Sequence, residues 1–303
     1  MAQMIASRLI QGIVVIIGVT LIVFLTSYMT GDPASLMLGE FATDTQIQAF
    51  TEAYGLDRPV MVQYWEFLTN AVRGDFGNSL HYKTSNLELV KERLPSTLKL
   101  AGISMLGALV FSIPLGIYSA RHHNTWKDTA IMACGVAGQS IPNFWLALLM
   151  IMHFGVELGW LPVSGMNTWK SYVMPSVTLM MWPLAQNIRM MRSSMLEVLD
   201  EEYTKLARAK GLHERVVIWK HALKNAIRPV LTQVGLQLGS FLGGAVITET
   251  IFAWPGIGRL AVQAIQVHDF PLLRTVAAMV ALGFVVINLT VDVLYAVIDP
   301  RVR

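Results

Sequence analysis

The stretch Arg189–Arg228, RMMRSSMLEVLDEEYTKLARAKGLHERVVIWKHALKNAIR, separates two long apolar runs of this chain. It holds nine Lys or Arg residues and five Asp or Glu residues within 40 positions. Charged side chains are costly inside a bilayer, so a segment of this kind between two apolar runs belongs in water. The stretch therefore predicts a membrane protein with a charged, water-exposed segment between two spans.

The composition of the whole chain indicates the same class. Hydrophobic residues make up 54% of the 303 residues and charged residues 14%, and the mean hydropathy is +0.51. We predict an all-α polytopic membrane protein with about six spans, because a run of roughly 20 apolar residues crosses the hydrocarbon core. The predicted spans are Leu9–Tyr28, Leu98–Ala120, Ala130–Phe154, Val173–Ile188, Val230–Thr248 and Thr275–Val297.

Three regions are expected along the chain. They are an N-terminal membrane helix (1–30), an external region (31–96) and a core membrane domain (97–303) that contains the charged loop 189–228. The first span is expected to be an uncleaved anchor, because its apolar core is longer than that of a signal peptide. Cys134 is the only cysteine, so no disulfide within the chain is possible.

Lys and Arg residues in the short loops set the orientation. With a cytoplasmic N-terminus, the inner side receives the dense basic loop 189–228, and the reverse topology would place it outside. Basic residues favour the cytoplasmic side of short loops. Both termini are therefore predicted to be cytoplasmic.

The external region has two predicted helices. Thr43–Tyr54 begins at a capping residue and ends at Gly55, and Pro59–Val72 carries apolar residues on one face. Two interpretations remain open for this region. It is either a small lid on the membrane domain or a docking surface for an external partner.

Polar and helix-breaking residues interrupt the third predicted span near Pro142. A proline leaves a backbone carbonyl without its helical partner, and hydrocarbon offers no replacement. The interruption is either a structural kink or the lining of a path, for which Gln139, Ser140 and Asn143 are the candidates. Asp292, within the sixth span, is likewise either a structural residue or a site of proton or cation coupling.

Catalytic motifs are missing. The chain has no Gly-Lys pair, so it has no Walker A loop, and the H-E-x-x-H and G-x-S-x-G patterns are absent as well. The histidine pair His122-His123 lies in a basic loop and is expected to be solvated. We predict no enzyme activity, no catalytic, metal-binding or cofactor-binding residue and no nucleic acid partner.

The charged loop contains two amphipathic runs. Apolar residues from Met195 to Leu206 recur at steps of three and four, which predicts a helix that continues to about Lys210 and ends at Gly211. A second amphipathic run starts at Val216 and leads into the fifth span. The loop is therefore expected to form a helix–glycine–helix elbow.

Two stretches of the loop, Glu202–Leu212 and His221–Pro229, resemble the coupling loop of binding-protein-dependent ABC importer permeases. The similarity is greatest to the dipeptide/oligopeptide/nickel branch, which includes glutathione transporters. It extends over essentially the whole chain. The other matching stretches are Gly31–Ala34, Glu249–Gly258, Asp292–Tyr295 and Asp299–Arg301.

The loop departs from the general permease pattern E-A-A-x-x-x-G-x(9)-I-x-L-P. Lys205-Leu206-Ala207 stands in place of E-A-A, and His221–Lys224 in place of I-x-L-P. Ala207, Gly211 and Leu223 match by position. The resemblance therefore supports the bend at Gly211 more than any role of Lys205.

The resemblance implies a permease that pairs with a second permease, two cytoplasmic ATPase subunits and an external solute-binding protein in a bacterial inner membrane. ATP and Mg would be bound by the partner subunits, with no cofactor on this chain. The residues implied in ATPase coupling are Glu202, Leu206, Ala207, Ala209, Gly211 and Leu212. Those implied in an external gate are Phe252, Trp254, Pro255, Gly256 and Gly258.

Peptides or similar small solutes of the dipeptide, oligopeptide or glutathione type are expected, with opines and chelated nickel as alternatives. Two other classes of function remain to be compared. An ion-coupled secondary transporter needs ionisable residues near the membrane midplane, where Asp292 stands nearly alone. A signalling scaffold would explain the elbow but not the interrupted spans.

Overall fold

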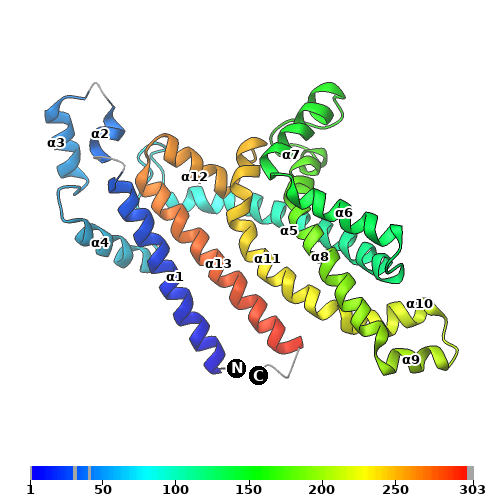
Figure 1. Ribbon diagram of the computed structural model, residues 1–303. Helices are drawn as coiled ribbons and strands as arrows, with labels where there is room; N and C mark the ends of the chain where they lie inside the picture. Colours follow the sequence, from blue (N-terminus) through cyan, green and yellow to red (C-terminus); the bar gives the residue numbers. More distant parts are fainter. Residues whose placement is uncertain (1, 30–32, 40–41, 299–303) are drawn as a thin grey trace. The chain divides into compact units, whose positions relative to one another are not determined.

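The computed structural model describes residues 2–29, 33–39 and 42–298, and most of them lie in helices (Figure 1). In this part of the chain the only β-structure is an isolated bridge between Asn78 and Ser85. The α-helices are α1 (Ala2–Met29), α2 (Pro33–Leu38), α3 (Asp44–Ala53), α4 (Val60–Val72), α5 (Asn86–Arg121), α6 (Trp126–Ser140), α7 (Asn143–Met150), α8 (Val173–Asp200), α9 (Glu202–Ala209), α10 (Glu214–Val216), α11 (Leu223–Ile251), α12 (Ile257–Gln266) and α13 (Phe270–Ile298). Ile151–Glu157 and Val217–Ala222 are π-helical, and Trp169–Tyr172 is a 3₁₀ turn.

The chain divides into two compact units, residues 1–97 with 255–289 and residues 98–254 with 290–303. In the first unit, α1 and α13 lie side by side, and a Cβ atom on Gly12 would come within 2.4 Å of Val285. Asp269, just before α13, accepts hydrogen bonds from the Ser79 hydroxyl at 2.5 Å and from the His81 N–H at 3.1 Å. The first unit thereby joins the segment before α5 to the segment before α13.

In the second unit, α8 packs against α11, α6 and α5. Its contact with α5 is very close at Gly116, where an added Cβ would lie 2.6 Å from Met191 Cβ and 3.0 Å from the carbonyl oxygen of Ile188. Pro183 and Pro229 lie inside α8 and α11 without ending them. The core of this unit therefore contains the two helices that flank the charged loop.

The all-α class is confirmed, but the number of about six spans is not. By length and composition, three helices among the described residues qualify as spans: Ala6–Met29, Asn86–Arg121 and Phe270–Val293. A fourth qualifies if Trp126–Ser140 and Asn143–Glu157, which meet at an angle of 96°, form one broken span. The helices α8 and α11 have 28 and 29 residues, so both are long enough to cross a bilayer.

One sequence prediction about a helix end needs correction. The helix α8 contains the predicted fourth span Val173–Ile188 and continues beyond it to Asp200. The single helix expected up to Lys210 is broken at Glu201, whose ψ of 147° is extended. Consecutive carboxylates explain the break, because acidic groups are unfavourable at the C-terminus of one helix and favourable at the N-terminus of the next.

The two helices predicted in the external region are confirmed as α3 and α4. Thr43 is the N-cap of α3, Gly55 follows it with a φ of +63°, and Pro59 is the N-cap of α4. The three-region division of the chain stays a prediction. Within the sequence stretches similar to permeases, Gly31, Asp32 and Asp299–Arg301 lie outside the described residues.

Candidate functional site

The predicted elbow is formed by α9, Gly211 and the helical segment that starts with α10. Gly211 has a φ of +77°, and its N–H donates to the carbonyl oxygen of Arg208 at 2.9 Å. The N–H of Leu212 donates to the carbonyl oxygen of Ala207 at 3.4 Å. A left-handed residue is a common end of a helix and favours glycine, so Gly211 stops α9 as the sequence predicted. In Figure 1, α9 and α10 lie at the end of α8 that is farthest from α7.

Hydrogen bonds connect α9 to both long helices of the second unit. The Thr204 hydroxyl donates to the carbonyl oxygen of Val198 at 2.9 Å, and Arg208 Nη1 donates to that of Leu199 at 3.3 Å. Both carbonyl groups belong to the last turn of α8. On the other side, Asn225 Nδ2 of α11 donates to the Tyr203 hydroxyl at 2.8 Å. The contacts of α9 with α8 and α11 are therefore short and direct.

An ion pair closes the elbow across Gly211. Arg208 donates to both carboxylate oxygens of Glu214, at 3.1 Å from Nε and 3.0 Å from Nη2. The hydrogen bonds with Arg208 hold the pKa of Glu214 below its usual value, and Glu214 in turn raises the pKa of Arg208. The two side chains are 38% and 42% exposed, so solvent weakens their attraction.

The two faces of α9 differ. Thr204 and Ala207 are buried against the rest of the unit, whereas Leu206 is 54% exposed. Five of the six residues implied in ATPase coupling are exposed, with Ala207 as the exception: Glu202, Leu206, Ala209, Gly211 and Leu212. The elbow thus presents a surface that contains exposed apolar side chains, which favours contact with another protein.

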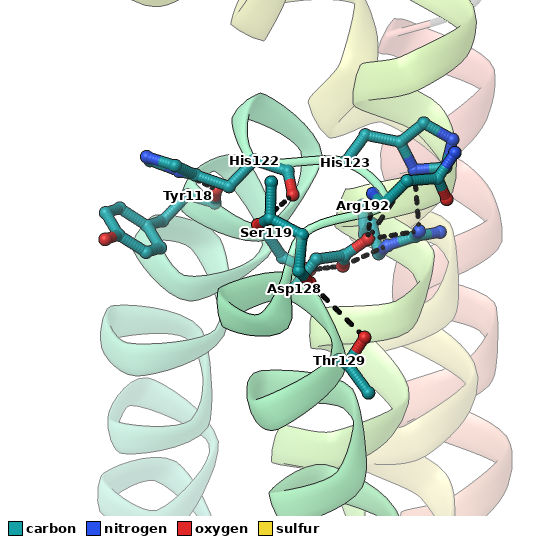
Figure 2. A network of polar contacts seen from close by, with 9 residues as sticks. Tyr118, Ser119, His122, His123, Asp128, Thr129 and Arg192 are labelled. Carbon is teal, nitrogen blue, oxygen red and sulfur yellow. Dashed lines mark hydrogen bonds and ion pairs between the residues drawn. The ribbon is translucent and has the colours of Figure 1, made fainter.

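A second polar cluster lies between the α5–α6 turn and α8, and Figure 2 shows Asp128 at its centre. Asp128 Oδ1 accepts hydrogen bonds from Arg192 Nε at 2.7 Å and from the Ser119 hydroxyl at 2.5 Å. Its Oδ2 accepts from Arg192 Nη2 at 2.7 Å and from the N–H of Asn124 at 3.1 Å. Arg192 Nη2 also lies 2.9 Å from His123 Nδ1. The cluster fixes α8 to the turn between α5 and α6.

Reasoning from the sequence missed this cluster. Asp128 is 4% exposed, and both of its carboxylate oxygens accept hydrogen bonds. Its role is therefore structural. The available signal was an acidic residue in the first turn of an apolar helix, where it complements the helix dipole. The partner, 64 positions away in the chain, could not be read from local spacing. His123, expected to be solvated, is exposed, and its Nδ1 lies 2.9 Å from Arg192 Nη2.

The residues implied in an external gate lie between the C-cap of α11 and the first turn of α12. Phe252 and Trp254 are 1% and 0% exposed, and Trp254 packs edge-on against Tyr172 with ring centroids 4.7 Å apart. Pro255, Gly256 and Gly258 follow in the turn before α12 and in its first residues. Neither aromatic side chain is exposed. Their part in a gate stays a prediction.

The path-lining candidates lie at the break between α6 and α7. Gln139 Oε1 accepts a hydrogen bond from Arg189 Nη2 of α8 at 3.2 Å, and the exposed Ser140 donates to the carbonyl oxygen of Val136 at 2.9 Å. Asn143 is the first residue of α7 and is partly buried. The expected interruption of this span is confirmed by the 96° bend. Whether these residues line a path stays a prediction.

Comparison with known proteins identifies the family. Residues 112–303 match the family described as binding-protein-dependent transport system inner membrane component, and residues 1–101 match its N-terminal part. The chain belongs to this family. The glutathione transport system permease protein GsiC of Escherichia coli K12 is 41% identical over 304 residues, which cover 100% of this chain and 99% of GsiC. The GsiC protein of Shigella flexneri serotype 5b is 40% identical over the same length.

Solved structures of ABC transporters have a similar fold. A chain of the inward-facing MetNI methionine ABC transporter aligns with a TM-score of 0.60 and 18% identity, over 70% of this chain and 96% of that one. A chain of an amino acid ABC transporter with histidines aligns with a TM-score of 0.51 and 17% identity, over 71% of this chain and 94% of the other. These alignments show a similar fold. The family match and the identity to GsiC identify this chain as a permease subunit of an ABC importer.

Proposed function

We propose that this permease forms the translocation path for peptide-like solutes such as glutathione, together with a second permease. Two cytoplasmic ATPase subunits would bind ATP and Mg, and an external binding protein would deliver the solute. The observation that carries the proposal is the 41% identity to GsiC over the whole chain. The placement is a bacterial inner membrane with both termini in the cytoplasm, which the basic loop 189–228 supports.

The elbow is the proposed contact with the ATPase subunits. Its exposed residues Leu206 and Leu212 offer apolar surface, and the hydrogen bonds of α9 to α8 and α11 provide the route for movement. When the ATPases close on nucleotide, they push α9, and α8 and α11 tilt with it. The path then opens alternately to each side, as a rigid-body transition of the kind found in other switching proteins.

The Gly211→Glu variant tests this coupling. Glutamate places a charged side chain at the bend and disfavours its left-handed backbone, so solute uptake is expected to be lost while the protein still inserts into the membrane. Gly211→Asn is the matched control, because asparagine tolerates the left-handed conformation. Uptake by proteoliposomes and solute-stimulated ATP hydrolysis are the measurements. Normal uptake together with normal stimulated hydrolysis in the glutamate variant would rule out the elbow as the coupling element.

The solute class needs a separate measurement. Cells that lack their own peptide and glutathione importers would express this permease with its partner subunits. Uptake of labelled glutathione, of a labelled dipeptide and of chelated nickel is then compared. The proposal expects uptake of glutathione or of the dipeptide above that of nickel. Transport of nickel alone would contradict the solute class while leaving the importer function intact.

A further inference from the structure

The amphipathic helix α4 belongs by sequence to the external region, yet it contacts α1 well below that helix's outer end. The Tyr64 hydroxyl donates to the carbonyl oxygen of Ile17 at 2.9 Å and lies 3.0 Å from the Thr20 hydroxyl. The Tyr64 ring also packs edge-on against Phe24, with ring centroids 5.4 Å apart. Figure 1 shows α4 against the middle of α1 rather than beyond its end.

The depth of this contact follows from helix geometry. Ile17 lies roughly 18 Å along the axis from Met29, the last residue of the candidate span Ala6–Met29, at 1.5 Å per residue. Half of the hydrocarbon core is only about 15 Å thick. A tyrosine side chain is too short to bridge such a distance from a helix that stays in the external water. The axis of α4 therefore lies at or below the outer boundary of the hydrocarbon.

The side chains on the different sides of α4 differ in polarity and exposure. Tyr64 faces α1 and is 7% exposed. To one side, at helical spacing, follow Met61, Trp65 and Val72, which are 60%, 67% and 90% exposed. The opposite side carries Gln63, Glu66 and Asn70, which line a hollow of about 270 Å³ within the first unit. An apolar side and a polar side thus flank the side that packs on α1.

We propose that α4 is an interfacial helix of the outer leaflet, with the side formed by Met61, Trp65 and Val72 in contact with lipid acyl chains. Lipid is favoured as the contact of this side of α4, because α1, on which α4 packs, also exposes apolar side chains. Only 17% of the most apolar window of α1 is buried, and its exposed residues include Ile10, Ile13 and Ile22. Amphipathic helices lie about 5–10 Å deep at this boundary.

The residues at the C-terminal end and centre of α4 agree with this placement. Arg73 is the C-cap of α4 and is exposed, whereas Arg58, which precedes the helix, donates a hydrogen bond to Glu66. A basic side chain at the position of Arg73 can reach lipid phosphates at the headgroup level. Tryptophan is enriched at the same level, because its ring is apolar and its N–H is polar. The external region is thereby held to the membrane by one of its own helices.

Site-directed spin labelling in vesicles tests the proposal. Single cysteines are introduced in a Cys134→Ser background by Met61→Cys and Trp65→Cys, and the full chain with its copurifying subunits is reconstituted in phosphatidylethanolamine and phosphatidylglycerol. The accessibility of each label to oxygen, which concentrates in lipid, is compared with that to a water-soluble nickel chelate. Ile13→Cys is the reference for lipid, and Asn70→Cys is the control on the polar side of α4.

Oxygen accessibility at Met61 and Trp65 is expected to exceed nickel accessibility, as at Ile13 but by a smaller factor, and the order of the two reagents is reversed at Asn70. Equal nickel accessibility at Trp65 and Asn70 would place α4 in water and overturn the proposal. Low accessibility to both reagents at Met61 and Trp65 would also overturn it, because a protein subunit would then cover this side. Two independent label positions guard against a local effect of either substitution.

Discussion

Two arginine–carboxylate pairs in the second unit have the same chemistry and different surroundings. Arg192 and Asp128 join residues 64 positions apart, and their side chains are 22% and 5% exposed. Arg208 and Glu214 are six positions apart, and their side chains are 38% and 42% exposed. Breaking a buried pair leaves an uncompensated charge, whereas an exposed pair is largely screened by water. The first pair therefore holds α8 to the turn between α5 and α6, and the second joins the two sides of the exposed elbow at Gly211.

The largest effect is expected for Arg192→Met. It leaves the Asp128 carboxylate buried without its main partner, and the free energy of unfolding should fall by roughly 3–5 kcal/mol. The amount of folded chain in the membrane and the midpoint of heat denaturation in detergent measure this loss. Partial recovery is expected in the double variant Asp128→Asn/Arg192→Met, because the unpaired charge is removed.

The matched control is Arg189→Met, in the same helix one turn earlier. Arg189 makes one described hydrogen bond, to Gln139 at 3.2 Å, so its replacement should change the stability by less than about 1 kcal/mol. Equal losses in the two methionine variants would show that the buried pair has no special part in holding α8.

Gly116→Ala is expected to have the next largest effect. The added methyl group would lie 2.6 Å from Met191 Cβ, at the close approach of α5 and α8, and overpacking of this kind costs about 1–3 kcal/mol. The same heat denaturation measures it. Gly102→Ala in the same helix meets no atom within 4 Å, so it should be neutral or stabilising. A loss of stability in both alanine variants would point to the backbone of α5 instead of the α5–α8 contact.

At the elbow, Gly211→Ala should have a smaller effect. A side chain at a φ of +77° costs roughly 1–2 kcal/mol, but the surroundings of Gly211 are open, so no packing term is added. Circular dichroism during heating would show a modest decrease in the denaturation midpoint. A decrease as large as that of Arg192→Met would mean that the elbow is as tightly packed as the buried pair.

The smallest effect is expected for Glu214→Gln, at most about 1 kcal/mol at neutral pH. Since Arg208 lowers the pKa of Glu214, the pair stabilises the fold above the pKa of the unfolded chain, about 4.3. This contribution is lost as the pH falls through the lower pKa of the folded protein. Stability curves of wild type and variant should therefore converge in acid. Curves that stay parallel from neutral to acid pH would contradict this role of the pair.

Local patterns in the sequence were sufficient for the features that depend on neighbouring residues. The end of α9 at Gly211 and the starts of α3 and α4 follow from capping residues and helical spacing, and all are confirmed. The break at Glu201 was missed, because the apolar stripe continues across it while the charges oppose a continuous helix. The coupling and gate residues were named by resemblance and not from spacing.

The amino-acid sequence by itself determined the all-α membrane class, the elbow at Gly211 and, through its similarity along the whole chain, the permease family. Hydrophobicity and helix propensity act over a few turns, so they can be read in order along the chain. Only the tertiary structure decided that Asp128 pairs with Arg192 and that α4 lies against Ile17. Those contacts join distant residues, and side-chain packing selects them from many chemically equivalent pairings.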